Sequence, residues 1–141
     1  MRILALDVGE KRIGVALSDA LNLIAQGLET IKRADDKETL TKIKELIKQH
    51  DVGKIIVGMP LNMDGSKGPS ARSMEDFISL MKKDIEVGIE VVDERLTTAQ
   101  GERILLEADV SRKKRKRSID KIAAQLILQT YLELHAQKNH S

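Results

Sequence analysis

Three acidic residues of this 141-residue chain stand where an ordinary surface charge is not expected. Asp7 lies inside the apolar segment of residues 3–8. Glu94 comes at the end of a second apolar segment, residues 89–93. Asp120 falls near the edge of the apolar stripe on the last amphipathic segment. An ionised carboxylate is costly to bury alone, so such a group is normally paired, protonated or bound to a metal ion.

Carboxylates that converge on one edge of a sheet are suited to divalent-metal chemistry. Hard cations such as Mg²⁺ prefer oxygen ligands and keep several waters. Two such ions, roughly 3.5–4 Å apart, can clamp the attacking and leaving oxygens during cleavage of a phosphodiester bond. The chain has no cysteine and only three histidines, which argues against a zinc site. The acids therefore favour metal-dependent phosphodiester hydrolysis.

Each acid also has a structural interpretation, which the residues alone leave open. Asp7 could accept hydrogen bonds from the backbone amides of a hairpin. Glu94 could pair within its own cluster, with Asp93 and Arg95 as neighbours. Asp120 could be stabilised by the dipole of its helix, because acids are favoured in the first helical turn.

Charge and aromatic content indicate how nucleic acid would be held. The net charge of +2 says little by itself, since 24 basic residues are offset by 22 acidic ones. We expect a basic loop before the last helix, either contacting phosphates or simply solvated, built from Arg112, Lys113, Lys114, Arg115, Lys116 and Arg117. Single strands are usually held by stacking on aromatic rings. With only Phe77 and Tyr131 available, any binding of nucleic acid must rely on phosphate contacts.

The hydrophobic pattern places these residues on a mixed α/β framework. Three strands are expected at 2–8, 12–18 and 26–32, the first two joined by a hairpin turn through Gly9. A capping box formed by Asp35 and Glu38 predicts a helix. The expected elements after the third strand are a helix over 36–50, a strand over 54–59, a helix over 70–83, a strand over 89–93, and helices over 97–108 and 118–137.

The expected order is therefore β-β-β-α-β-α-β-α-α in a single domain spanning residues 1–141. Strand–helix alternation in the second half implies parallel pairing with right-handed crossovers. We predict one five-stranded mixed sheet with helices on both faces. No apolar run approaches the roughly 20 residues needed to cross a bilayer, so we expect a cytoplasmic protein without membrane contact. The oligomeric state, monomer or homodimer, is left open.

The residues singled out above fall in four segments that follow one another in a fixed order. The sequence resembles the YqgF/RuvX family of bacterial ribonuclease H-like proteins over essentially its whole length. The resemblance rests on Leu6-Asp7-Val8-Gly9 with Arg12-Ile13-Gly14-Val15-Ala16 and Ser18-Asp19; Val57-Gly58-Met59-Pro60-Leu61 with Asp64-Gly65-Ser66; Asp93-Glu94-Arg95-Leu96-Thr97-Thr98; and Asp120-Lys121-Ile122-Ala123-Ala124 with Ile127-Leu128.

The resemblance implies a ribonuclease H-like fold and a catalytic, metal-binding trio of Asp7, Glu94 and Asp120. It implies Mg²⁺ or Mn²⁺ as cofactor and structured RNA or branched DNA as partner. Arg12 and Arg95 would contact phosphates or pair with nearby acids. The wider superfamily often uses a fourth acid, and no clear candidate follows Asp120.

The family's members are described as pre-16S rRNA nucleases and, in older descriptions, as Holliday junction resolvases. We therefore expect an endonuclease that processes the 5′ end of pre-16S rRNA during ribosome biogenesis. Resolution of branched DNA is the alternative, and non-catalytic RNA binding is a second one. Hairpin strands with an Asp-x-Gly sequence also occur in two-domain ATPases, but 141 residues supply only one such domain.

Overall fold

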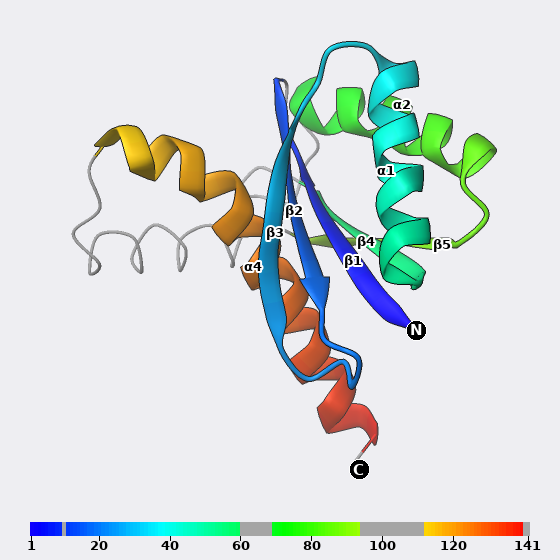
Figure 1. Ribbon diagram of the computed structural model, residues 1–141, viewed down its shortest axis with the longest axis vertical. Coiled ribbons are helices and arrows are strands. Elements are labelled where there is room, and N and C mark those ends of the chain that lie inside the picture. The colour runs from blue at the N-terminus through cyan, green and yellow to red at the C-terminus, as the bar shows by residue number, and fades with distance from the viewer. Residues whose placement is uncertain (10, 60–68, 94–111, 140–141) are drawn as a thin grey trace.

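The protein was analysed as a computed structural model, which describes residues 1–9, 11–59, 69–93 and 112–139. Five strands and three helices are seen in these ranges (Figure 1). In chain order they are β1 (Arg2–Val8), β2 (Arg12–Ser18), β3 (Ala25–Lys32), α1 (Asp36–His50), β4 (Val52–Met59), α2 (Pro69–Asp84), β5 (Gly88–Asp93) and α4 (Arg112–Asn139). The helix predicted over 97–108 lies outside the described residues.

The strands form one five-stranded sheet in the order β3-β2-β1-β4-β5. β1, β2 and β3 pair antiparallel, whereas β4 runs parallel to β1 and β5 parallel to β4. This confirms the predicted mixed sheet, in which a meander of three strands continues into parallel pairing. The carboxyl ends of β1, β4 and β5 consequently lie at the same edge, which we call the carboxyl edge.

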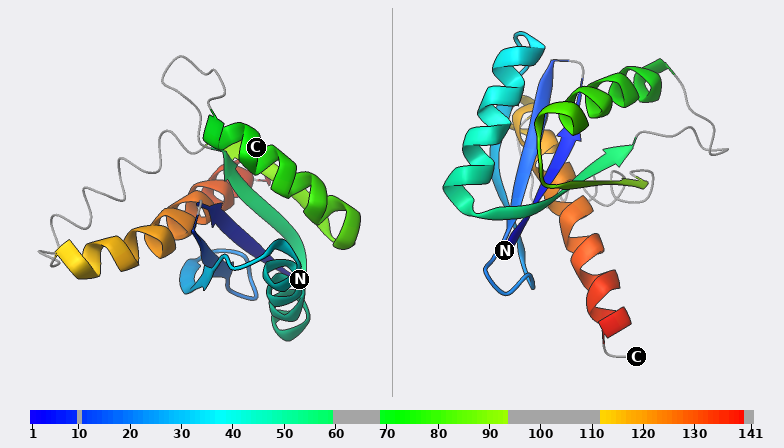
Figure 2. Two further views of the ribbon diagram at one scale, coloured as in Figure 1. Left: turned by 90° about the horizontal axis from the view of Figure 1, so that it is seen from above. Right: turned by 90° about the vertical axis from the view of Figure 1, so that its right-hand side faces the viewer.

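Large aliphatic side chains fill one face of the sheet. Leu4, Leu6 and Val8 on β1 alternate with residues of the other face, as a strand requires. α1 and α2 cover this face and contribute Ile43 and Met81, both fully buried. In the right-hand view of Figure 2 these two helices lie in front of the sheet and α4 lies behind it. Both faces are thus covered, as predicted.

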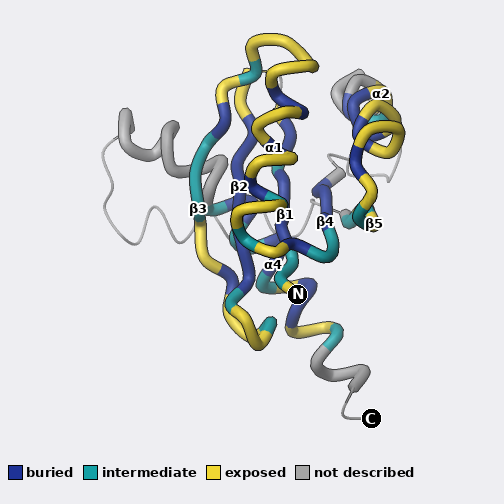
Figure 3. Tube along the Cα trace, turned by 45° about the vertical axis from the view of Figure 1, so that its right-hand side comes forward, coloured by how far each residue is buried: buried dark blue, intermediate teal, exposed yellow. Residues whose placement is uncertain are grey.

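On β1, β2 and β3 the buried side chains beneath α4 are small, whereas β4 contributes Ile56 to this face. Ala5, Ala16 and Ala25 pack there against Ala124 and its neighbours on the helix. Small residues let a helix axis approach a sheet closely. The two faces of the sheet therefore differ in the size of their side chains, and Figure 3 shows that β1 and β2, which contribute to both faces, are largely buried.

The start of α1 confirms its predicted cap. Asp35 is in the extended conformation and its side chain accepts a hydrogen bond from the backbone N–H of Glu38, at 2.8 Å. The helix ends at Asp51, which adopts the left-handed conformation with φ 54°. These local signals fix α1 between β3 and β4.

The prediction for the last helix was wrong at its start. The sequence predicts a basic loop followed by a helix over 118–137, but α4 begins at Arg112 and continues for 28 residues. The residues of the expected loop are therefore the first turns of the helix. Lys and Arg are good helix formers, and neither Gly nor Pro interrupts residues 112–139, so the helix extends through the basic run.

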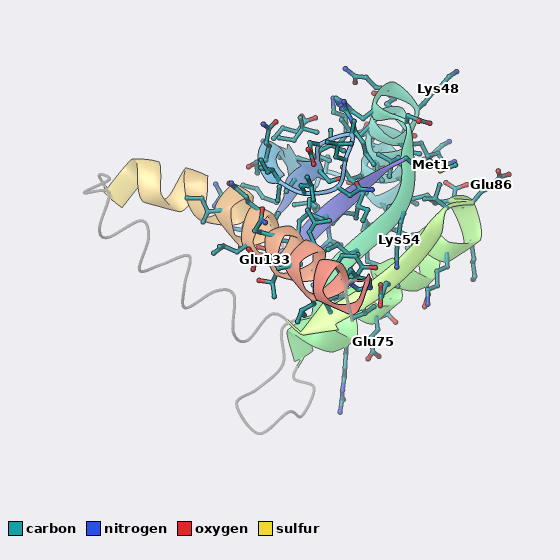
Figure 4. The ribbon with its side chains drawn as sticks, turned by 90° about the horizontal axis from the view of Figure 1, so that it is seen from below. Met1, Lys48, Lys54, Glu75, Glu86 and Glu133 are labelled. Atoms are coloured by element: carbon teal, nitrogen blue, oxygen red, sulfur yellow. The ribbon has the colours of Figure 1, made fainter. Side chains whose placement is uncertain are left out.

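A polar cluster fastens the C-terminal half of α4 to the strands. The Lys54 ammonium donates to the hydroxyl of Tyr131 on α4 and lies 2.8 Å from the carboxylate of Glu90 on β5. Figure 4 shows Lys54, which belongs to β4, close to α4 and β5. The hydrogen bond from Lys54 holds the pKa of Glu90 below its ordinary value, and the same contact with Glu90 raises the pKa of Lys54.

No helix in the described ranges is both long enough and apolar enough to cross a membrane.

Replacing Lys54 with Met should lower the free energy of unfolding by about 1–2 kcal/mol, because it removes one hydrogen bond and one half-exposed ion pair. Urea denaturation at pH 7 measures this. Glu90 contributes fully to the free energy of unfolding above its ordinary pKa of 4.5. This contribution is lost as the pH falls through the lower pKa that Glu90 has in the folded protein. The difference between the two proteins should therefore shrink at acidic pH.

Lys42→Met is the matched control, because Lys42 meets Glu29 only at 4.0 Å on the surface. Its effect should stay within about 0.5 kcal/mol. Equal losses in the two variants would contradict a special role for Lys54.

Candidate active site

Asp7 lies at the carboxyl edge, one residue before the end of the central strand β1. Strand alternation puts it on the same face as Ala5, which packs beneath α4. The residue is half-buried and takes part in an interaction. Asp7 thus lies at the sheet edge, on the side that α4 covers.

Two glycines flank Asp7 on this face. Gly14 of β2 is its direct partner in the antiparallel pair. On the other side Leu6 pairs with Val57, so the next step along both strands brings Gly58 beside Asp7. Because neither neighbour carries a side chain, the space beside the carboxylate on both adjacent strands is left to other groups. Sequence reasoning missed this role for Gly58, since it depends on the register between β1 and β4.

The turn after β1 is closed by a hydrogen bond from the Gly9 N–H to the carbonyl of Arg12, at 2.8 Å. A Cβ on Gly9 would lie 2.9 Å from that carbonyl oxygen, so only glycine fits without a shift of the backbone. Arg12 itself is exposed and takes part in an interaction of its own. The predicted phosphate contact by Arg12 remains a prediction.

The second predicted acid, Glu94, and its neighbour Arg95 lie outside the described residues. The strand that leads to them is described: β5 ends at Asp93, which pairs with Met59 at the carboxyl edge. Val92, one residue earlier, pairs with Gly58 and packs on the face covered by α4.

The third acid, Asp120, belongs to α4, and only its backbone is described. The side chains of residues 112–121, which include the basic run, lie outside the described part of the structure. Ala124, one helical turn further on, packs against the sheet in the cluster that contains Ala5. Asp120 therefore precedes a point of direct packing on the face that carries Asp7.

The direction of α4 decides towards which edge the backbone of Asp120 lies. Gln129 accepts a hydrogen bond from the N–H of Ala25 at 2.9 Å, and Ala25 pairs with Ser18 at the start of the β2–β3 turn. This turn is at the edge opposite Asp7, so earlier residues of α4 run towards the carboxyl edge (Figure 1).

Among the described residues no group of three or more histidines, cysteines or acids is close enough to hold a metal ion. Of the predicted ligands only the side chain of Asp7 is within that part of the chain. Its chemistry fits a hard cation, because it offers carboxylate oxygens beside two positions without side chains.

The chain is similar to known proteins in both sequence and structure. The model of the RuvX family, described as Holliday junction resolvase, matches residues 1–134. A protein of Halothermothrix orenii is 56% identical over 132 residues, covering 94% of each chain. One of Natranaerobius thermophilus is 51% identical over the full length of both chains. Both are named "Putative pre-16S rRNA nuclease".

Two solved structures share the fold at low sequence identity. RuvC of T. thermophilus, in complex with a Holliday junction substrate, has a TM-score of 0.62 at 12% identity and covers 97% of this chain and 96% of its own. The Fowlpox virus resolvase, in complex with Holliday junction DNA, has a TM-score of 0.56 at 14% identity, with 94% and 97% covered. The predicted ribonuclease H-like fold is thereby confirmed.

Gly9→Ala should destabilise the protein by roughly 1–3 kcal/mol, because the added methyl meets the backbone carbonyl of Arg12 and must displace the turn. Urea denaturation measures the loss. Gly88→Ala is the matched control: a Cβ there has no atom within 4 Å, so stability should be unchanged or slightly raised. A neutral Gly9→Ala variant would show that the turn is not constrained in this way.

Proposed function

The chain belongs to the RuvX family, and we propose that this nuclease is a metal-dependent endonuclease that processes the 5′ end of pre-16S rRNA. The observation that carries the proposal is the position of Asp7. Its carboxylate stands at the carboxyl edge of a central strand, between two glycines and on the face covered by α4. Ligands of open α/β sheets bind at this kind of edge.

We propose that Asp7, Glu94 and Asp120 are the catalytic residues and the metal ligands. Glu94 follows Val92 by two residues, and Val92 packs on the face that carries Asp7; if the alternation of β5 continued, Glu94 would share this face, which supports its inclusion. The direction of α4 supports the third member, because residues before Ala124 run towards the carboxyl edge. The three acids would then meet above the row formed by Gly14, Asp7 and Gly58.

The trio would hold Mg²⁺ or Mn²⁺ through carboxylate oxygens. When bound, such an ion supplies an activated water and stabilises charge on the leaving oxygen. The chain's own part is to place Asp7 on a rigid central strand, bonded on both sides. Ligands on a strand keep their geometry better than ligands on a loop.

Positively charged side chains of arginine and lysine would bind the nucleic acid. Arg12 is exposed at the turn beside Asp7, and Arg95 directly follows the second proposed acid. The six cations of residues 112–117 occupy the first turns of α4, which extend beyond the sheet in Figure 1. Phosphate contacts fix position without reading sequence, so they suit structured RNA.

Two substrates have support from named relatives. The names of relatives that match over most or all of their length favour precursor rRNA. The family's description favours a Holliday junction, and this remains the alternative. We place the protein in the cytoplasm, as one nuclease domain spanning residues 1–141, where precursor rRNA would be met.

Asp7→Asn should lower the cleavage rate by roughly 10²–10³-fold with Mn²⁺, because the amide cannot replace the charge of the carboxylate. A fluorescently labelled precursor rRNA fragment under single-turnover conditions measures this. RNA binding should be retained, since the variant removes a negative charge. Mn²⁺ should raise the melting temperature of the wild type and leave that of the variant unchanged.

Asp76→Asn is the matched control, because Asp76 is exposed on α2 and the same atoms are exchanged. It should cleave as the wild type does. Undiminished cleavage by Asp7→Asn would reject the proposed site, and binding without any cleavage by the wild type would favour a non-catalytic RNA-binding protein.

Precursor 16S rRNA and a synthetic four-way DNA junction should be compared side by side at equal salt and Mn²⁺ concentration. We expect the RNA to be cleaved faster by about tenfold or more, a ratio that reports differential binding of the transition state. Cleavage of the junction alone would reverse the assignment in favour of a resolvase.

A further inference from the structure

Arg33 lies between β3 and α1 and contacts the turn that follows Asp7. Its backbone N–H donates to the carbonyl of Lys11 at 2.9 Å. Its guanidinium donates through Nη1 to the carbonyl of Gly9 at 2.8 Å. A single residue therefore holds both sides of the turn between β1 and β2.

The guanidinium is enclosed by groups from two helices. Its central carbon lies 4.9 Å from the centre of the Phe77 ring on α2. Another of its nitrogens, Nη2, is 3.8 Å from the carboxylate of Asp36 at the start of α1. Only 19% of the side chain is exposed. Arg33 thus faces the protein, and it is poorly placed to act as a phosphate ligand itself.

The turn held by Arg33 separates Asp7 from two exposed cations, Lys11 and Arg12. The Gly9 N–H also bonds to the Arg12 carbonyl, and Arg33 donates two further hydrogen bonds to the described residues of this turn. Because these bonds hold the backbone carbonyls of Gly9, Lys11 and Arg12, the directions of the Lys11 and Arg12 side chains are restricted. Ordering before binding increases affinity, since less conformational freedom is lost in the complex.

We propose that Arg33 is a positioning residue, which orders the β1–β2 turn so that Lys11 and Arg12 contact substrate phosphates beside Asp7. This inference rests on the proposed function, in that it assumes a nucleic acid held next to Asp7. Lysine cannot replace Arg33, because an ammonium lacks the planar fork that donates to Gly9 while lying over Phe77.

Arg33→Lys tests the proposal, because it leaves the net charge unchanged. Binding of a precursor rRNA fragment and of a four-way DNA junction is measured in EDTA over a series of salt concentrations. Each lost phosphate contact should reduce the slope of log K against log salt by about 0.7–0.9. We expect the slope for the variant to correspond to one or two fewer phosphate contacts than the slope for the wild type. The variant should also bind about tenfold more weakly at moderate salt.

Two controls separate positioning from other roles. Arg2→Lys makes the same exchange at the opposite edge and should leave the slope unchanged. In a Lys11→Gln/Arg12→Gln background, adding Arg33→Lys should cause no further loss, because the contacts that it positions are already gone. Thermal unfolding verifies that each variant is folded at the temperature of the assay.

An unchanged slope in Arg33→Lys overturns the inference, whether or not the variant is less stable. A further loss in the double-variant background would also overturn it, as would the absence of salt-dependent binding by the wild type. Because binding is measured without metal, the outcome is independent of cleavage. Wild-type protein that binds but does not cleave with Mn²⁺ would reject the proposed function while leaving the role of Arg33 intact.

Discussion

The close packing of α4 on the sheet is the constraint on which the rest of the structure depends. A sheet covered on both faces must bury both sets of alternating side chains, and here the two sets differ in size. Leucine and isoleucine face α1 and α2, whereas Ala5, Ala16 and Ala25 face α4. This asymmetry brings the backbone of α4 near β1 and β2, and the Lys54–Tyr131 contact holds the helix there.

The same constraint shapes the proposed catalytic edge. Asp7 is the acid on the small-residue face of β1. Its neighbours on the adjacent strands, Gly14 and Gly58, are smaller still than the alanines of this face. The carboxylate thereby gains room beside it while its backbone is held by two strands. Behind the edge, on the other face, Arg33 fastens the following turn to α1 and α2. A rigid strand and neighbouring positions without side chains suit the metal-binding role proposed for Asp7.

The sequence predicted those features that local chemistry determines. The hydrophobic pattern located all five strands within about two residues, and Asp35 with Glu38 marked the start of α1. The start of α4 was missed, because a run of lysine and arginine reads as a solvated loop although it is compatible with a helix. Gly58 beside Asp7 and Arg33 beneath Gly9 were missed because both depend on contacts between distant segments.

The position of α4 after all five strands has a consequence for biosynthesis. As the chain leaves the ribosome, the strands and α1 can assemble while the alanine-lined face is still bare, because its cover is synthesised last. A nascent chain at that stage exposes an apolar surface through which it could associate with other chains. Folding of α4 onto the sheet ends this exposure, because the helix buries Ala5, Ala16 and Ala25.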